Sequence, residues 1–570
     1  MKRKTPVYMA AMLMLVLALV ITGCAGNNGG NTPSNTSSPG TNSGNEGGNG
    51  EQPLEKVTFT YFNGAGAAKD INTNETTLGK IFEDQTGVNF KIENLVGDLN
   101  TKIGTMNASR KYPDVLIPDA AIDDVVGAGG FIDLTDLIEE HGPNIKKAYG
   151  SDLERMKTED GKIYYLPMSA QVGEFIPDPN IGQGAFWIQR RVLKEAGYPE
   201  VKTIDQYFDL IRDYVKKHPE EGLTGFISLT HDWRFFATTN PPMHLAGYPN
   251  DGGVIVDMDT FEAKVYANSD YTKQYLKMLN ELNAEGLFDK SSFIDNYDQY
   301  LAKLTSGKVL GMFDYGWQIA NAQNVLMDAA KADPAQDDFV YFPLPVTFDG
   351  RKDQYLDPPS FVKNRGIGIT ISAQDPVRII QYFDNMLKEE NQILRSWGIE
   401  GETYEIDENG RYYRTPEQIA KIDEAFRESF GFKYFDWNWP LYSASSTFSN
   451  GNAVSPGVQP EVFQLSLTEA DKTILNAYGA QTYAEMFAAP DDRPWFPAWG
   501  IPKEQGSPEQ IYETKSEEVT RKYFPKLVLE EPSKFESNWE EFLSEFNKLD
   551  YAGYEAFMTA EVKKLIEETK

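Results

Sequence analysis

The chain has almost no cysteine and little histidine, which excludes several classes of site. It contains one cysteine, Cys24, and four histidines among 570 residues. A single cysteine cannot close a disulfide within the chain. No histidine has a second histidine or a cysteine at the spacing of a transition-metal site, so we expect no bound metal.

The sequence also lacks the motifs of common catalytic and cofactor sites. There is no G-x-x-x-x-G-K-[ST] phosphate loop and no G-x-S-x-G nucleophile turn. Gly64-Ala65-Gly66 lacks the third glycine of a dinucleotide-binding loop, so we interpret it as a tight turn. We therefore expect no cofactor and assign no catalytic residue. Carboxylates are numerous, however, and a glycoside hydrolase whose acidic pair the sequence does not single out stays an alternative.

Positive charge is scarce. Lys and Arg number 54 against 85 Asp and Glu, which gives a formal net charge of −31. A surface of this sign repels phosphate backbones and acidic lipid headgroups, so we expect no nucleic-acid partner. No run after residue 24 is long and apolar enough to span a bilayer.

The first residues carry a targeting signal. Basic residues at positions 2–4 precede an apolar run at 9–21, which is shorter than the roughly 20 residues of a membrane-spanning helix. The sequence Ile21-Thr22-Gly23-Cys24 resembles a bacterial lipobox, in which the cysteine is alkylated by a diacylglycerol. Residues 1–23 are thus predicted to be a lipoprotein signal peptide, and Cys24 the lipidation site on the extracytoplasmic face of the cell membrane. An ordinary secretory cleavage and an uncleaved anchor are the alternatives.

Residues 24–53 separate this signal from the folded part. They consist almost entirely of Gly, Asn, Ser, Thr and Pro, which cannot repay the entropy of ordering, so we predict a disordered tether. Its r.m.s. reach of roughly 30 Å suits a thick cell wall and favours a Gram-positive bacterium. The remainder, 54–570, is too long for one core and predicts at least two lobes.

The folded part begins with alternating and helical patterns in turn. Residues 57–61 and 88–95 alternate with a period of two, and 115–117 form a short apolar run. Between them, apolar side chains recur at helical spacing. This βαβαβ pattern predicts a parallel sheet that binds ligands at the carboxyl ends of its strands.

The pattern continues through the rest of the chain. A capping box, Thr203 with Gln206, predicts a helix start, and Asp375-Pro376 predicts another. The fold class expected is α/β with a helical C-terminal region. Further strands are predicted at 163–166, 226–229, 309–313, 339–342 and 367–371, and helices at 186–196, 271–285, 416–429, 468–487, 508–522 and 535–567.

Aromatic residues are abundant, at 13% of the chain, and several tryptophans lie in loop-like contexts. An indole packs well on the apolar C–H face of a pyranose, whose hydroxyls need amide and carboxylate partners. Trp317 follows a predicted strand at its carboxyl end. Trp437 and Trp439 flank Asn438 and are predicted to share one side of an extended segment. Tryptophan is nevertheless more often a core residue than a ligand platform.

Several segments in order resemble one family, the extracellular solute-binding proteins of ABC importers, family 1, in the long lipoprotein branch of Gram-positive bacteria. Each segment alone is weak, and together they span about residue 54 to the C-terminus. They are Tyr112-Pro-Asp-Val115, the Asp-Gly-Lys-Ile-Tyr-Tyr-Leu-Pro segment at 160–167, the helix end at 192–197 with the helix start at 203–207, the Leu-to-Trp stretch at 301–317, the Asp-Pro element at 367–387 and the helix at 539–554.

The resemblance implies a two-lobed, periplasmic-binding-protein-like type II fold whose lobes close on a ligand by a hinge. It implies a first lobe at 54–168 and 361–395, a second lobe at 169–360 and 396–570, and chain crossings near 161–169 and 361–367. It further implies a monomer that captures a carbohydrate, with an oligosaccharide favoured, and delivers it to ABC permease subunits. Calcium stays unassigned.

The resemblance also bears on the ligand-binding residues. It implies that Trp317 is the stacking indole and that polar contacts come from Tyr61, Asn63 and Asp119 in the opposite lobe. To these we add, on their aromatic and polar character alone, further candidates: Trp233, Trp397 with Glu400, Trp437 and Trp439. A surface glycoside hydrolase and a surface scaffold or sensor without transport are the alternative functions.

Overall fold

The computed structural model describes residues 55–66, 69–158, 160–493 and 495–569. The predicted signal peptide, the lipidation site Cys24 and the tether up to residue 53 lie outside the described residues. Leu54–Lys570 forms one compact unit. In the part of the chain that the structure describes, no helix has both the length and the apolar content of a membrane span.

The first sheet confirms the βαβαβ prediction. Strand β1 (Val57–Asn63) pairs in parallel with β3 (Val88–Asn94) on one side and β4 (Val115–Ile117) on the other. The crossovers are the helices α1 (Thr77–Thr86) and α2 (Leu99–Ser109). Because the strands are parallel, their carboxyl ends lie at one edge of the sheet.

The full sheet has the order β2-β3-β1-β4-β13-β5, in which β2 (Ile71–Asn72) pairs antiparallel with β3. Strand β13 (Gly366–Ile369) returns from far along the chain and pairs antiparallel with β4 and with β5 (Leu166–Pro167). Helix α14 (Pro376–Met386) follows, and the Asp375 carboxylate caps it by accepting from the Arg378 N–H at 3.2 Å. The prediction of a helix start at Asp375-Pro376 is confirmed.

The second sheet has the order β12-β7-β11-β8. Strand β11 (Val309–Tyr315) runs parallel to β8 (Thr224–Ile227) and antiparallel to β7 (Gly184–Gln189), which also pairs with β12 (Tyr341–Leu344). The predicted helix at 186–196 is therefore wrong over its first part. The periodicity of a short apolar run that is buried on both faces does not distinguish a strand from a helix. In the structure, only α7 (Arg190–Glu195) is helical.

Helix α8 (Ile204–Lys217) begins at the predicted capping box. The Thr203 hydroxyl accepts from the Gln206 N–H at 3.3 Å, and the Gln206 side chain accepts from the Thr203 N–H at 3.1 Å. These two bonds satisfy N–H groups that a helix start leaves unpaired. The buried face of the helix comprises Ile204, Tyr207, Phe208, Ile211 and Tyr214.

From residue 508 onward the chain is helical, as predicted, and packs on the second core. Helix α20 (Pro508–Leu529) lies against α11 (Asp270–Ala284). The single helix predicted at 535–567 is two, α21 (Phe535–Phe546) and α22 (Tyr551–Glu568). Asp550 caps the start of α22, because its carboxylate accepts a hydrogen bond from the Gly553 N–H at 3.0 Å.

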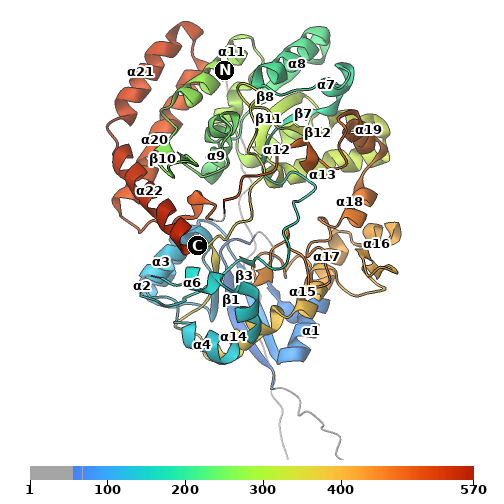
Figure 1. The fold of residues 1–570 in the computed structure, drawn as a ribbon, viewed down its shortest axis with the longest axis vertical. Coiled ribbons are helices and arrows are strands. Elements are labelled where there is room, and N and C mark those ends of the chain that lie inside the picture. The colour runs from blue at the N-terminus through green and yellow to red at the C-terminus, as the bar shows by residue number, and fades with distance from the viewer. Residues whose placement is uncertain (1–54, 67–68, 159, 494, 570) are drawn as a thin grey trace, which may run out of the picture. The chain divides into compact units, whose positions relative to one another are not determined.

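Each of the two lobes has its own large hydrophobic core. In Figure 1 the first lobe lies around β1 and β3, and the second lies around β7, β8 and β11. Aromatic side chains between 397 and 462 belong to the first core. Trp439, for example, lies 5.0 Å from Tyr61 and 5.3 Å from Phe90 between ring centres. The predicted assignment of everything after residue 396 to the second lobe is thus wrong, because this stretch buries its rings against the first sheet.

Within the residues that the structure describes, the chain passes between the two cores three times. It leaves the first core after Ala170 and enters the second at Ile181, then returns between Leu356 and Phe361. A third passage, which the sequence did not indicate, lies between 462 and 474. Three connecting segments, rather than two, therefore join the lobes.

Candidate ligand-binding site

A cavity of about 820 Å³ opens on the second lobe. This volume lies in the range of sites that take small-molecule ligands. The residues around it come from the end of β11, from η4 (Asp232–Phe235), α9 (Phe236–Thr239) and α20. Aromatic, amide and charged side chains line it, among them Trp233, Phe236, Asn240, Asn250, Tyr266, Tyr315, Trp317, Asp357, Arg365, Glu513 and Glu517.

Two exposed indoles form one wall of the cavity. The rings of Trp233 and Trp317 are 5.9 Å apart between centres and inclined by only 7°. Phe236 lies 5.9 Å from Trp233 and 5.1 Å from Tyr315, so the aromatic wall is continuous. Trp233 is 59% exposed and Trp317 52% exposed, although rings of this size are usually covered. We call this pair of indoles the indole platform.

The strand-to-helix junction positions Trp317. It is the second residue of α13 (Gly316–Ala332), which begins where β11 ends. A Cβ at Gly316 would lie 1.8 Å from the carbonyl oxygen of Ile181, so only glycine fits before this tryptophan. The start of α13 is thereby held against the segment that enters the second lobe.

A buried carboxylate, Asp314, supports the same junction. Its oxygens accept from the Tyr315 N–H, the Gln318 amide and the Tyr300 hydroxyl, each at 2.7 Å. Burial raises the pKa of Asp314 to about 7, even though these hydrogen bonds oppose the shift. Asp314 is a positioning residue, because its contacts fix the backbone from which Trp317 projects.

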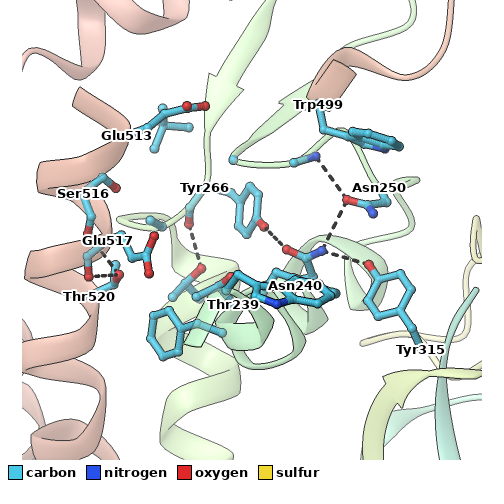
Figure 2. Close-up of a pocket in the computed structure, with 18 of the residues that line it drawn as sticks. Thr239, Asn240, Asn250, Tyr266, Tyr315, Trp499, Glu513, Ser516, Glu517 and Thr520 are labelled. Carbon is cyan, nitrogen blue, oxygen red and sulfur yellow. Dashed lines mark hydrogen bonds between the residues drawn. The ribbon is translucent and has the colours of Figure 1, made fainter. Parts of the chain in front are cut away.

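An amide network forms the polar wall opposite α20. The Asn240 Nδ2 donates to the Tyr315 hydroxyl at 2.8 Å, and its Oδ1 accepts from the Tyr266 hydroxyl at 3.2 Å. Asn240 also donates to Asn250 Oδ1 at 3.3 Å (Figure 2). These bonds hold the amides and phenols in fixed orientations around the cavity. The sequence prediction missed this network, since single asparagines in loops give no signal.

Helix α20 contributes an acidic wall. Figure 2 shows Glu513, Ser516, Glu517 and Thr520 along the side of this helix that borders the cavity. Glu513 accepts from the Tyr554 hydroxyl at 2.7 Å and lies 3.0 Å from the Lys503 ammonium. Arg365 is the basic side chain among the described residues that line the cavity, and it is paired with Asp119 at 2.6 Å. The lining therefore carries more negative than positive charge.

The structure brings together some of the predicted site residues. Trp317 and Trp233 line the cavity side by side, and Asp119 reaches its edge through the ion pair with Arg365. Tyr61 and Asn63, by contrast, are buried at the end of β1. Tyr61 donates to the Asn438 carbonyl at 2.6 Å and Asn63 to Asn94 Oδ1 at 3.1 Å, so both are engaged within the first lobe.

The remaining predicted residues do not line the cavity. Trp397 and Trp439 are fully buried in the first core, and their indole N–H groups donate to backbone carbonyls at 2.9 and 2.8 Å. The prediction that they contact ligand is wrong, because packing in the core already uses their whole surface. Trp437 is 43% exposed but borders no described cavity, and Glu400 forms a backbone bridge with Tyr404.

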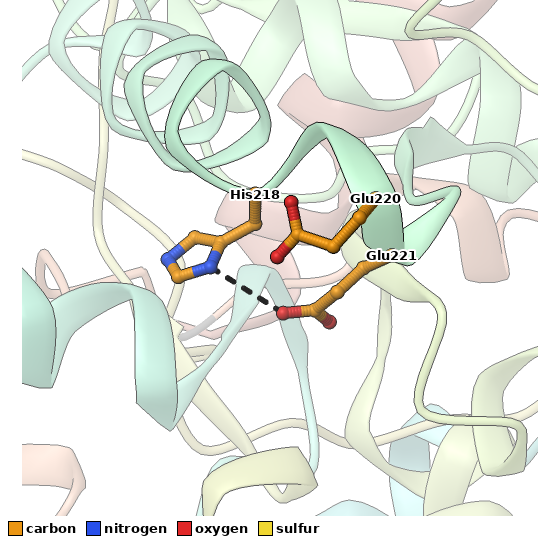
Figure 3. Close-up of side chains that lie close together, drawn as sticks. All are labelled: His218, Glu220 and Glu221. Atoms are coloured by element: carbon orange, nitrogen blue, oxygen red, sulfur yellow. Dashed lines mark ion pairs between the residues drawn. The ribbon is translucent and has the colours of Figure 1, made fainter.

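One group of side chains has the spacing of metal ligands, namely His218, Glu220 and Glu221 (Figure 3). His218 Nε2 is already 2.6 Å from Glu195, and Glu221 lies 2.8 Å from the Arg191 guanidinium. Because these partners satisfy the charges, the group is explained as an ion-pair cluster between α7 and the end of α8. It lies apart from the cavity of the indole platform.

Comparisons with known proteins agree with the fold. A family model described as "Bacterial extracellular solute-binding protein" matches residues 77–396. The fructooligosaccharide ABC transporter substrate-binding protein FusA of Streptococcus pneumoniae is 26% identical over 264 residues, which are 44% of this chain and 48% of FusA. The aligned part thus spans about half the length of this curated relative.

Solved structures match over nearly the whole chain. FusA of S. pneumoniae in complex with kestose has a TM-score of 0.65 at 17% identity, covering 90% of this chain and 100% of FusA. The alginate-binding protein AlgQ2 without calcium ion gives 0.60 at 16% identity, covering 90% and 98%. An HMO-binding, ABC-transporter-associated solute-binding protein from Bifidobacterium longum infantis gives 0.60 at 15%, covering 89% and 98%. These likenesses confirm the predicted two-lobed fold.

Proposed function

The chain belongs to the bacterial extracellular solute-binding protein family, and we propose that it captures a carbohydrate outside the cytoplasmic membrane and delivers it to an ABC permease. The observation that carries the proposal is the indole platform, two solvent-exposed tryptophans stacked inside a cavity of about 820 Å³. Exposed indoles of this size are costly in water unless a ligand covers them.

The chemistry of the cavity suits a sugar on both of its walls. A saccharide ring packs its C–H face on the indole platform, and its hydroxyls then point toward amide and carboxylate groups. Asn240, Asn250 and the Tyr266 hydroxyl supply such partners and are held in place by their own hydrogen bonds. Preorganised polar groups lower the ordering cost of binding.

The lining charge favours a neutral glycan. Glu517 and Asp357 border the cavity, whereas Arg365 is neutralised by Asp119. An anionic sugar would meet like charge across a partly desolvated space, which weakens binding. We expect neutral oligosaccharides to bind more tightly than the matching uronate-containing ones. Tighter binding of the uronates would contradict this assignment.

Calorimetric titration of residues 54–570 tests the carbohydrate proposal. Kestose, the ligand named for the FusA complex, is the first probe, followed by plant, fungal and host oligosaccharides. We expect micromolar or tighter binding of at least one neutral glycan and, by small-angle scattering, a compaction on its addition. Binding of peptides or lipids with no binding of any glycan would refute the proposal.

We further propose that Cys24 anchors the protein to the extracytoplasmic face of the membrane. The sequence Ile21-Thr22-Gly23-Cys24 supports the proposal. Labelled fatty acid should enter the wild-type protein but not Cys24→Ser, which should appear in the medium instead. Label in the Cys24→Ser variant would place the lipid elsewhere. We expect the protein to act as a monomer, which light scattering of the tether-less form checks.

Glycoside hydrolysis is an alternative function for the same cavity, and it can be tested directly. FusA and the Bifidobacterium longum infantis protein are named as binding proteins of ABC transporters, and we propose that this chain likewise leaves its ligand chemically unchanged. Chromatography after prolonged incubation of purified protein with bound oligosaccharides decides the question. Shorter products would establish an enzyme.

A further inference from the structure

A second, smaller cavity adjoins the one that holds the indole platform. It has a volume of about 160 Å³ and shares two lining residues, Gln183 and Asp357, with the larger cavity. Its other walls come from the segments that connect the lobes and from Ser443 and Ser445, beside β16 (Leu441–Tyr442). We call it the junction cavity.

The two cavities draw on different lobes. Apart from Arg365, near the start of β13, the larger cavity is lined by residues of the second lobe and of the segments leading into it. The junction cavity adds Gln171 and Ser443, which lie next to strands packed on the first core. A ligand favours closure of two lobes only if it contacts both. A ligand that extends into the junction cavity meets this condition.

Asp357 stands at the boundary between the cavities with an unused hydrogen-bond acceptor. Its Oδ1 is buried and receives no hydrogen bond from any residue that the structure describes. A buried polar atom without a partner calls for an explanation, and a ligand or water that donates to it supplies one. The neighbouring buried pair, Asp251 and Arg493 at 2.8 Å, contributes charge but does not supply that bond.

We propose that Asp357 accepts a hydrogen bond from a hydroxyl of a saccharide that runs from the indole platform into the junction cavity. The inference rests on the proposed function and deepens it, since it makes the preferred ligand an oligosaccharide of at least two units. A monosaccharide on the platform alone leaves the Asp357 oxygen unpaired and the first lobe untouched.

The affinity for such a saccharide should depend on pH. Burial and the nearby Asp251 carboxylate raise the pKa of Asp357 to about 7, while Arg493 acts in the opposite direction. The Tyr315 phenol, also close, stays neutral because burial raises its pKa. An ionised carboxylate is the stronger acceptor, so binding should tighten as the pH rises from about 6 to about 8, as Asp357 ionises.

The test uses three homologous series of neutral saccharides, based on fructose, glucose and N-acetylglucosamine, each from one to four units. Calorimetry on wild type should show a marked gain in affinity from one to two or three units in the best series. Asp357→Asn should weaken binding of the longer members by about 10- to 100-fold, as expected for a lost hydrogen bond to a charged group. It should also reduce the pH dependence of that binding.

Two further variants make the outcome decisive. Ser443→Phe fills the junction cavity from the first lobe and should abolish the preference for longer saccharides even if Asp357→Asn folds poorly. Asp349→Asn, at an exposed aspartate outside both cavities, is the matched control and should change nothing. Equal affinity of wild type for one and three units, or an unaltered preference in Ser443→Phe, would overturn the inference alone. No binding of any saccharide would overturn the proposed function itself.

Discussion

Two pairs of tryptophans, one in each lobe, have opposite environments. Trp233 and Trp317 in the second lobe are more than half exposed and stack on each other beside a cavity. Trp397 and Trp439 in the first lobe are fully buried, and each donates its indole N–H to a carbonyl of the core. The same side chain thus lies open to solvent beside a cavity in one lobe and is packed into the core in the other.

An abundance of aromatic residues therefore does not by itself distinguish a binding surface from a core. A buried indole with a satisfied N–H contributes its whole surface to stability. An exposed indole contributes little to the fold, because most of its surface stays in water, and ligand binding is the role that we propose for it. Four substitutions test this contrast, and we give them in order of expected effect.

The largest effect is expected for Trp439→Ala. Removal of this ring leaves a cavity among Tyr61, Phe90 and Phe435, and the Tyr434 carbonyl loses its donor. We expect a loss of about 3–5 kcal/mol in the free energy of unfolding. Urea denaturation followed by fluorescence measures it, with Trp439→Phe as the milder control. A stable Trp439→Ala protein that has lost saccharide binding would reverse our assignment.

Trp317→Ala should act on binding instead. Loss of the indole from the platform should weaken saccharide binding by about 1–3 kcal/mol. The free energy of unfolding should change by no more than about 0.5 kcal/mol, as for other exposed positions. Calorimetry and urea denaturation on the same preparation separate the two quantities. If both fall together, Trp317 belongs to the core after all.

The two platform indoles should be energetically coupled. Their rings are parallel within 7° at 5.9 Å, so each orients the other. A double-mutant cycle of Trp233→Ala and Trp317→Ala, measured on saccharide affinity, should give a coupling of about 0.5–1.5 kcal/mol. Strict additivity would mean that the two rings act as separate contacts.

The smallest effect is expected for Trp437→Ala. This indole is 43% exposed, yet it borders no described cavity. Both the affinity and the free energy of unfolding should stay within about 0.5 kcal/mol of wild type. A loss of affinity here would show that the ligand extends over the first lobe beyond the junction cavity.

Local sequence patterns predicted much of the fold. Alternation at β1 and β3 and the caps at Thr203 and Asp375 depend on residues close in sequence, and all of them were confirmed. The failure at β7 has the opposite cause. All six residues of this strand are buried, so neither face is exposed and no polar alternation marks the strand.

The site was predicted only in part, for a related reason. Trp317 follows directly from its place at the end of a strand, and Trp233 from its aromatic character. Asn240, Asn250 and Asp357 were missed, since their role depends on partners far away in sequence, and Asp357 is notable for a hydrogen bond that it does not make.

Neighbouring residues and sums over the chain were enough to predict most of the strands and helices, the excess of acidic charge and the family resemblance. Contacts between distant segments set which tryptophans face solvent, place residues 397–462 on the first lobe and bring Asp357 between two cavities. Burial is a property of the assembled chain: the free energy of an indole depends on what the distant segments place against it.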